Sequence, residues 1–165
     1  TYPLPEAQQD RFMLKVKVDY PTREEELQIV RENIAGIDNI TLQPVASAQD
    51  VLRARELCRQ VYMDEKIEHY LLDLVMATRY PADAGLPDLK PLLSYGASPR
   101  ASISMAQASR AVAMLSKRAY VIPDDVKQIA VDVLRHRIGL TYEAAAEEVT
   151  ADDIIGKILG KVKAP

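Results

Sequence analysis

The apolar pattern of the chain starts with a period of two and changes to a helical period after residue 20. Residues 12–19 (FMLKVKVD) alternate apolar and polar side chains, which predicts a β-strand with one apolar face. Two prolines within residues 1–11 oppose a regular element there, apart from a short helical turn at residues 8–11. No second strand of similar quality follows, so we expect this strand to pair with a sheet formed by residues outside the chain.

Helical patterns dominate from residue 21 onward. Capping-box sequences predict helix starts at Thr22 and at Ser47, the second helix covering residues 48–59, and both helices have an apolar side. Within the connector between them, an extended segment is predicted at residues 41–45. A third helix is predicted after Asp64, because its apolar residues recur along one face with spacings of three and four.

The second half of the chain combines a long loop with further helices. Residues 80–97 are rich in proline and glycine, and a loop of this length is more often functional than not. Three helices are predicted after it, at residues 98–118, 123–137 and 151–162, with a connector or short helix at 142–148. The predicted fold class is therefore mainly α, a helical bundle preceded by one β-strand.

The composition is that of an ordinary globular protein. The chain has 165 residues, of which 48% are hydrophobic and 27% charged. Its net charge of -3, with basic residues scattered among acidic ones, argues against nucleic acid or an anionic membrane as partner. The single cysteine, Cys58, excludes an intrachain disulfide and is expected to be a buried small hydrophobe. Without an apolar run of about 20 residues or a signal peptide, we expect no membrane insertion and a cytoplasmic location.

Motifs for nucleotide or metal binding are absent from the sequence. The nearest match to a phosphate-binding loop, residues 156–162 (GKILGKV), has its glycines one residue too close and no serine or threonine after the lysine. One cysteine excludes a zinc cluster, and His69 and His136 have no catalytic partners by spacing, so we predict no metal site and structural roles for both. Because the chain starts at Thr1, we expect it to be part of a longer protein.

Arg100 is the strongest candidate for contact with an anion, because of its position at the start of a helix. It is the second residue of a helix that Ser98 caps and Pro99 begins. A helix N-terminus presents free N–H groups and a partial positive charge, so an arginine there is unfavourable unless an anion such as phosphate lies nearby. The alternative is a surface arginine paired with Asp88 or another acid. Arg11, directly before the predicted strand, is on its own merits a solvated arginine at a strand edge.

Four segments resemble motifs of the MoxR family of AAA+ ATPases, in that family's order and at about its spacing. Residues 1–12 (TYPLPEAQQDRF) are similar to its PLPEAQ-x-DRF segment, and residues 96–101 (GASPRA) to its GASPRA segment. Residues 120–126 (YVIPDDV) and 133–138 (VLRHRI) resemble two further signatures. The resemblance covers essentially the whole chain, which is identified as the C-terminal part of such a protein.

The resemblance implies a nucleotide-binding α/β core followed by a helical lid. The Walker A, Walker B and sensor-1 segments of that core would precede this chain. Residues 1–20 would then be the C-terminal end of the core, including the arginine-finger segment and the last strand. Residues 21–165 would be the helical linker and the AAA+ lid domain.

The resemblance also implies roles for individual residues and for the intact protein. Arg11 resembles the arginine finger, which contacts the ATP of a neighbouring subunit, and Arg100 resembles the sensor-2 arginine, which contacts the γ-phosphate of its own subunit's ATP beside Ser98 and Pro99. The intact protein would use ATP and Mg²⁺ in a homo-oligomeric ring, a hexamer by analogy, with a chaperone-like role in maturing or remodelling client proteins and von Willebrand A-domain proteins as partners. This chain alone is predicted to be inactive and to bind no nucleotide tightly.

Two other interpretations stay open on the sequence. A freestanding helical protein-interaction module over residues 21–162, with no nucleotide role, explains the missing phosphate-binding loop but not the strand that precedes it. A helical DNA-binding domain conflicts with the net charge of -3 and with the lack of a basic helix face.

Overall fold

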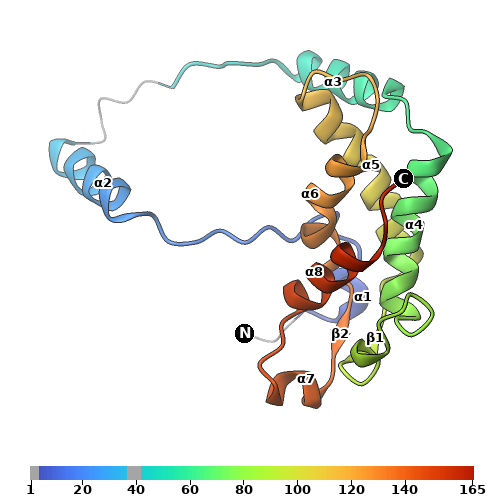
Figure 1. The fold of residues 1–165 in the computed structure, drawn as a ribbon. Helices are drawn as coiled ribbons and strands as arrows, with labels where there is room; N and C mark the ends of the chain where they lie inside the picture. The colour runs from blue at the N-terminus through green and yellow to red at the C-terminus, as the bar shows by residue number, and fades with distance from the viewer. Residues whose placement is uncertain (1–3, 37–41) are drawn as a thin grey trace.

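A computed structural model describes residues 4–36 and 42–165, and these residues are mostly helical (Figure 1). A single sheet of two short strands occurs among them, so the predicted mainly α fold class is confirmed. Within the described ranges, no helix has both the length and the apolar character that crossing a bilayer requires. The first three residues of the TYPLPEAQQDRF motif lie outside the described part.

Four helices form the bundle that holds the core: α4 (Glu65–Arg79), α5 (Pro99–Leu115), α6 (Pro123–Leu134) and α8 (Ala151–Lys161) (Figure 1). α5 packs along α6 and α4, and α8 packs against α4 and α6. Buried alanines on α5 let the neighbouring helices approach closely, as close-packed interiors require. Large side chains that are at most 2% exposed fill the space between the helices: Tyr70, Leu74, Leu89, Met105, Leu134, Ile154, Ile155 and Ile158.

Helix starts fall where the capping residues predict them. The side chains of Thr22, Ser47 and Thr150 each accept the N–H of the third helical residue and complete a reciprocal capping box. The side chains of Asp64 and Ser98 accept the N–H of the second helical residue. Because these bonds join residues two or three positions apart, local sequence is sufficient to specify them.

β1 (Leu93–Tyr95) and β2 (Gly139–Leu140) form a two-stranded antiparallel sheet that the sequence pattern does not predict. β1 ends the proline- and glycine-rich loop at residues 80–97, which also contains the 3-10 turn η2 (Pro87–Leu89). Strands of two or three residues have no readable alternation, which is why the pattern did not reveal them. The short helix α7 (Tyr142–Ala146) follows β2, as one of the two predictions for this stretch has it.

Residues 12–19, predicted as a strand that pairs with residues outside the chain, form no strand in the described structure. After α1 (Glu6–Gln9) this segment has no regular secondary structure: it contacts the end of α6 at Lys15 and then leads away towards α2 (Arg23–Ala35) (Figure 1), and no described strand pairs with it. Its alternate apolar side chains are exposed, Phe12 by 59% and Val18 by 92%. Alternation indicates that one face of a segment is apolar. A strand also needs a neighbouring strand to pair with its N–H and C=O groups, and none is present here among the described residues.

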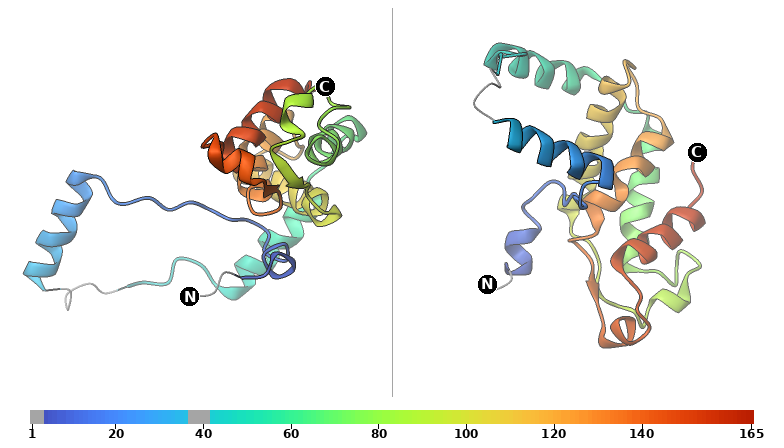
Figure 2. Two further views of the ribbon diagram at one scale, coloured as in Figure 1. Left: turned by 90° about the horizontal axis from the view of Figure 1, so that it is seen from below. Right: turned by 90° about the vertical axis from the view of Figure 1, so that its left-hand side faces the viewer.

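α2 lies apart from the bundle, as Figure 1 and the left view of Figure 2 show. The apolar side that the sequence predicts for it is present, but it faces solvent rather than a core. Its exposed apolar residues, at 48% or more, are Leu27, Ile29, Val30 and Ile34. This surface therefore contributes nothing to the stability of the described fold.

α3 (Ala48–Gln60) lies across one end of α5 (Figure 1). Cys58 on α3 is half-buried, not fully buried as predicted, because α3 touches the bundle along only part of its surface. Of the extended segment predicted at residues 41–45, Thr41 lies outside the described residues and residues 42–45 form no strand.

Candidate functional site

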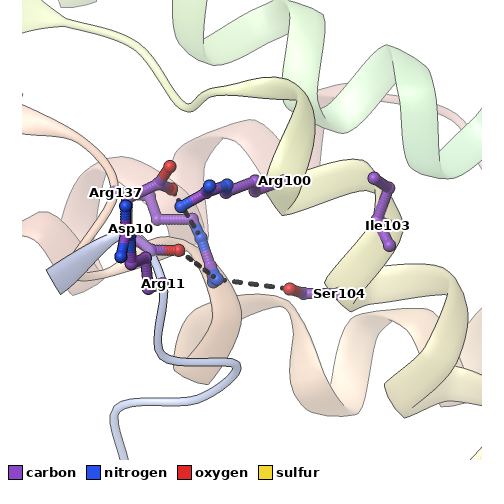
Figure 3. A pocket seen from close by; sticks show the side chains of 6 residues that line it. All are labelled: Asp10, Arg11, Arg100, Ile103, Ser104 and Arg137. Carbon is purple, nitrogen blue, oxygen red and sulfur yellow. Dashed lines mark hydrogen bonds and ion pairs between the residues drawn. The ribbon is translucent and has the colours of Figure 1, made fainter. Parts of the chain in front are cut away.

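A pocket of about 280 Å³ lies between the segment that follows α1 and the first turns of α5 (Figure 3). The structure brings the two arginines singled out by the sequence, Arg11 and Arg100, to this one pocket. Figure 3 shows Arg100 extending from the start of α5 towards the segment that carries Arg11. The full lining consists of Asp10, Arg11, Arg100, Ile103, Ser104 and Arg137.

Arg100 owes its position to the way α5 begins. Ser98 has extended backbone angles, and its Oγ accepts the N–H of Arg100 at 3.2 Å, while Pro99 occupies the first helical position. The first turn of α5 carries no acidic residue, so nothing in the helix itself offsets its partial positive charge. The described lining does not include Ser98 or Pro99, whose visible role is to set the helix start.

Asp10 links the two sides of the pocket. Its carboxylate oxygens accept the hydroxyl of Ser98 at 3.0 and 2.9 Å, and its Oδ1 also accepts Nε of Arg137 at 3.0 Å. Arg11 is the next residue in the chain, so the backbone that carries Arg11 is tied to the start of α5. Sequence reasoning missed Asp10, because its partners are remote in sequence and no local pattern marks them.

Arg137 is the third guanidinium of the pocket, and its side chain is only 1% exposed. Besides Asp10 Oδ1, it donates to the backbone carbonyls of Asp10 (3.1 Å), Phe12 (2.5 Å), Met13 (3.0 Å) and Val133 (2.5 Å). It also donates to Ser104 Oγ at 3.2 Å. Burial lowers the pKa of Arg137, the Asp10 carboxylate raises it, and the charge of Arg100 lowers it further. Even so, an arginine remains protonated at neutral pH, so the carboxylate and carbonyls surround a fixed cation.

His136 and Arg135 extend this contact along the same segment. His136 Nε2 lies 3.0 Å from the carbonyl oxygen of Phe12, to which it donates in the tautomer that carries its proton on Nε2. Arg135 donates to the carbonyl of Lys15 at 3.0 Å and to Asp152 at 3.1 Å. This contact agrees with the structural role predicted for His136. His69, by contrast, is 70% exposed on α4 and away from the pocket.

The electrostatics of the pocket favour an anion. Three guanidinium groups and one carboxylate line it, and the N-terminus of α5 adds the partial positive charge of the helix dipole. Arginines present planar pairs of donors that match the oxygens of a phosphate group. Among the described residues, no group of three or more His, Cys, Asp or Glu side chains is placed to hold a metal ion.

The family comparison assigns this fold to a known class of domain. Residues 88–158, which include all of α5 and α6 and most of α8, match the model of the AAA lid domain. A crystal structure of a candidate ATPase from Cytophaga hutchinsonii has a TM-score of 0.95 to this chain at 43% sequence identity. The match covers 99% of this chain and 50% of that one.

Curated relatives give the particular family. The chain is 40% identical to Chaperone MoxR1 of Mycobacterium tuberculosis over 99% of its own length and 43% of that protein. It is 37% identical to protein YeaC of Bacillus subtilis, over 100% of its length and 49% of the relative. The chain belongs to the MoxR family of AAA+ proteins and contains its lid domain. It spans about half the length of the curated relatives it matches.

Proposed function

We propose that this chain supplies the lid and the two phosphate-contacting arginines of a MoxR-type AAA+ ATPase. The observation that carries the proposal is the shared pocket, in which Arg11 and Arg100 meet at the N-terminus of α5. Hydrolysis of ATP develops charge on the transferring phosphoryl group, and guanidinium groups placed around that group stabilise it. ATP, Mg²⁺ and the Walker residues would meet these arginines from a nucleotide-binding core.

The shared pocket also bears on which nucleotide each arginine contacts. The resemblance assigns Arg11 to the ATP of a neighbouring subunit and Arg100 to the ATP of its own. Two guanidinium groups that line one pocket of about 280 Å³ are placed to contact one phosphate group rather than two separate nucleotides. We therefore propose that Arg11 and Arg100 of one chain act together on the nucleotide of the neighbouring subunit, in a homo-oligomeric ring.

The wider role is proposed from the relatives. One of them is named a chaperone, which supports ATP-driven maturation or remodelling of client proteins for the protein that contains this chain. A hexameric ring, von Willebrand A-domain partners and a cytoplasmic location are proposed on the family resemblance alone.

The test is steady-state ATP hydrolysis by the protein that carries this chain together with its nucleotide-binding core. Arg11→Ala is expected to lower turnover by about 10³-fold or more while leaving ATP affinity nearly unchanged, because a finger acts mainly on the transition state. Arg59→Ala, on the exposed surface of α3, is the control for loss of one surface cation. Normal turnover by the Arg11→Ala protein would show that the pocket is not the site of phosphate contact.

A further inference from the structure

The residues that hold the Arg11 segment form a compact cluster at the end of α6. We call Arg135, His136 and Arg137 the clasp, because their side chains bond to three successive parts of the chain from Asp10 to Lys15. The backbone adds one more bond, from the N–H of Lys15 to the carbonyl of Asp132 at 2.9 Å. The segment is therefore held by the lid through its main chain, while its own apolar side chains remain exposed.

We propose that Arg137 and Asp10 are positioning residues that fix Arg11 relative to Arg100, so that both arginines move with the lid as one unit. The proposal deepens the function proposed above and rests on it. Neither positioning residue needs to touch the nucleotide. Each acts through the arginine whose location it determines.

The bonding around Asp10 gives this coupling its geometry. Arg11 is joined to Asp10 by one peptide bond. Arg100 is connected to the same carboxylate through Ser98, whose Oγ both donates to Asp10 and accepts the N–H of Arg100. Arg137 completes the link by bonding to the carboxylate and to the carbonyl groups on either side of Arg11.

The burial of Arg137 makes this arrangement selective for its side chain. A cation with 1% exposure must have its donors occupied, and the planar guanidinium does so with six oxygen acceptors in several directions. A lysine at this position keeps the charge but has a single nitrogen with three donors, so it cannot bond to all of these groups at once. Arg137→Lys therefore separates the geometry of the clasp from its charge.

A distance measurement tests the coupling without relying on catalysis. Spin labels are attached at Gln8 and Gln107, two exposed positions on α1 and α5, in a Cys58→Ser background of the 165-residue chain. Pulsed electron paramagnetic resonance then measures the distribution of distances between the two labels, and so between the Arg11 segment and α5. We expect a single narrow distribution with Arg137 in place, and a clearly broader one in Arg137→Lys.

Asp10→Asn is the second variant, and it guards against a folding defect at the buried position. Asp10 is 22% exposed, and asparagine keeps the shape of the side chain while removing the charge that pairs with Arg137. The distribution should broaden in this variant too. Arg59→Lys on α3 is the matched control and should leave it unchanged. Unchanged distributions in both Arg137→Lys and Asp10→Asn would overturn the proposal.

Turnover separates a positioning role from a merely structural one. In the protein that includes the nucleotide-binding core, Arg137→Lys should lower kcat by about 100-fold, because misplacement of a catalytic group by about 1 Å has that effect, with KM for ATP little changed. Broadened distances with an unaltered kcat would refute the positioning role. If Arg11→Ala and Arg100→Ala themselves turn over normally, the proposed function fails, whatever the spin labels show.

Discussion

At the level of single residues, the pocket holds more positive than negative charge in a small volume. Arg11, Arg100 and Arg137 line the pocket with one carboxylate, Asp10, which pairs with Arg137, and Arg137 is too buried for water to screen its charge. Like charges this close repel one another, and the charge of Arg100 lowers the pKa of Arg137 accordingly. A phosphate between the arginines would offset that repulsion, so this arrangement of charges favours an anion.

Arg100→Ala should therefore alter nucleotide preference and leave the fold intact. Loss of a charge-assisted bond to the terminal phosphate should reduce discrimination between ATP and ADP by about 1.5–3 kcal/mol. The melting temperature should hardly change, because a cation is removed from a helix N-terminus and from beside Arg137. Isothermal titration with ATP and ADP, on the protein that includes the nucleotide-binding core, measures the preference, and thermal melting measures the stability. A variant that melts much earlier yet keeps its ATP preference would identify Arg100 as a structural residue.

His136 makes a pH-dependent contribution to stability. Burial lowers its pKa, and the nearby charges of Arg137 and Lys15 lower it further, so the folded chain holds the ring neutral below its ordinary value of about 6.5. As pH falls through about 6.5, the unfolded chain binds a proton that the folded chain does not, and stability decreases until the lowered pKa is reached.

The expected result is a fall in the free energy of unfolding between pH 7 and the lowered pKa of His136, measured by denaturant titration at several pH values. His136→Gln removes the titrating group, so its stability should vary less over the same interval. His69→Gln, at an exposed position on α4, is the control and should follow the parent chain. Equal slopes for His136→Gln and the parent would contradict the assignment.

At the level of elements, α6 is fixed at both ends by ionic contacts. Its C-terminal end leads into the clasp. At its start, the carboxylate of Asp125, 2% exposed, accepts the N–H of Ile122 at 2.8 Å and pairs with both terminal nitrogens of Arg118. Burial raises the pKa of Asp125, but the bonds from Arg118 and Ile122 outweigh it and hold the pKa below its ordinary value. One carboxylate thus ties the loop after α5 to the first turn of α6.

Asp125→Ala should destabilise the fold by about 2–3 kcal/mol, since it removes the ionic partner of Arg118 and the acceptor of the Ile122 N–H. The lower part of the range for broken buried pairs applies, because the Arg118 side chain is 24% exposed and water can reach it. Lys127→Ala breaks the neighbouring ion pair with Asp124, in which both side chains are well exposed, and should change stability by less than about 1 kcal/mol. Denaturant unfolding of the two variants compares them directly, and equal losses would show that burial is not the cause.

Whether an element could be predicted from the sequence depends on how far apart in the chain its bonded residues lie. The starts of α2, α3, α4, α5 and α8 depend on caps that act across two or three residues, and each was predicted. The sheet of β1 and β2 and the clasp depend on pairs far apart in the chain, and neither was. Arg100 was found because its own helix position marks it. Asp10 and Arg137 gain their importance from each other, which no local pattern can express.

At the level of the whole molecule, the described fold leaves apolar surface without cover. The alternate apolar residues from Phe12 to Val18 and the apolar side of α2 are exposed, although each has the pattern of a buried element. The chain also spans about half the length of its curated relatives. We propose that residues 12–19 pair with a sheet in the rest of such a protein, in the way the sequence analysis expects.

The arrangement of subunits gives the most discriminating prediction. If Arg11 and Arg100 both serve the neighbouring subunit's nucleotide, each active site receives both arginines from one chain. Mixing Arg11→Ala subunits with Arg100→Ala subunits should then restore no activity, because every chain that reaches a neighbour's site lacks one arginine. If instead Arg100 serves its own subunit, the same mixture contains interfaces with both arginines intact, and activity should return.

Mixtures with a subunit that cannot bind ATP complete the test. A Walker A variant keeps both arginines and lacks only its own nucleotide, so it should rescue Arg11→Ala and Arg100→Ala alike when both act between subunits. If Arg100 instead serves its own subunit, the Walker A variant should rescue Arg11→Ala alone. One chain must then supply both the bound ATP and Arg100, and neither the Arg100→Ala subunit nor the Walker A subunit supplies both. ATP hydrolysis across mixing ratios distinguishes the two patterns, and recovery of activity in the Arg11→Ala and Arg100→Ala mixture would refute joint action on the neighbour's phosphate.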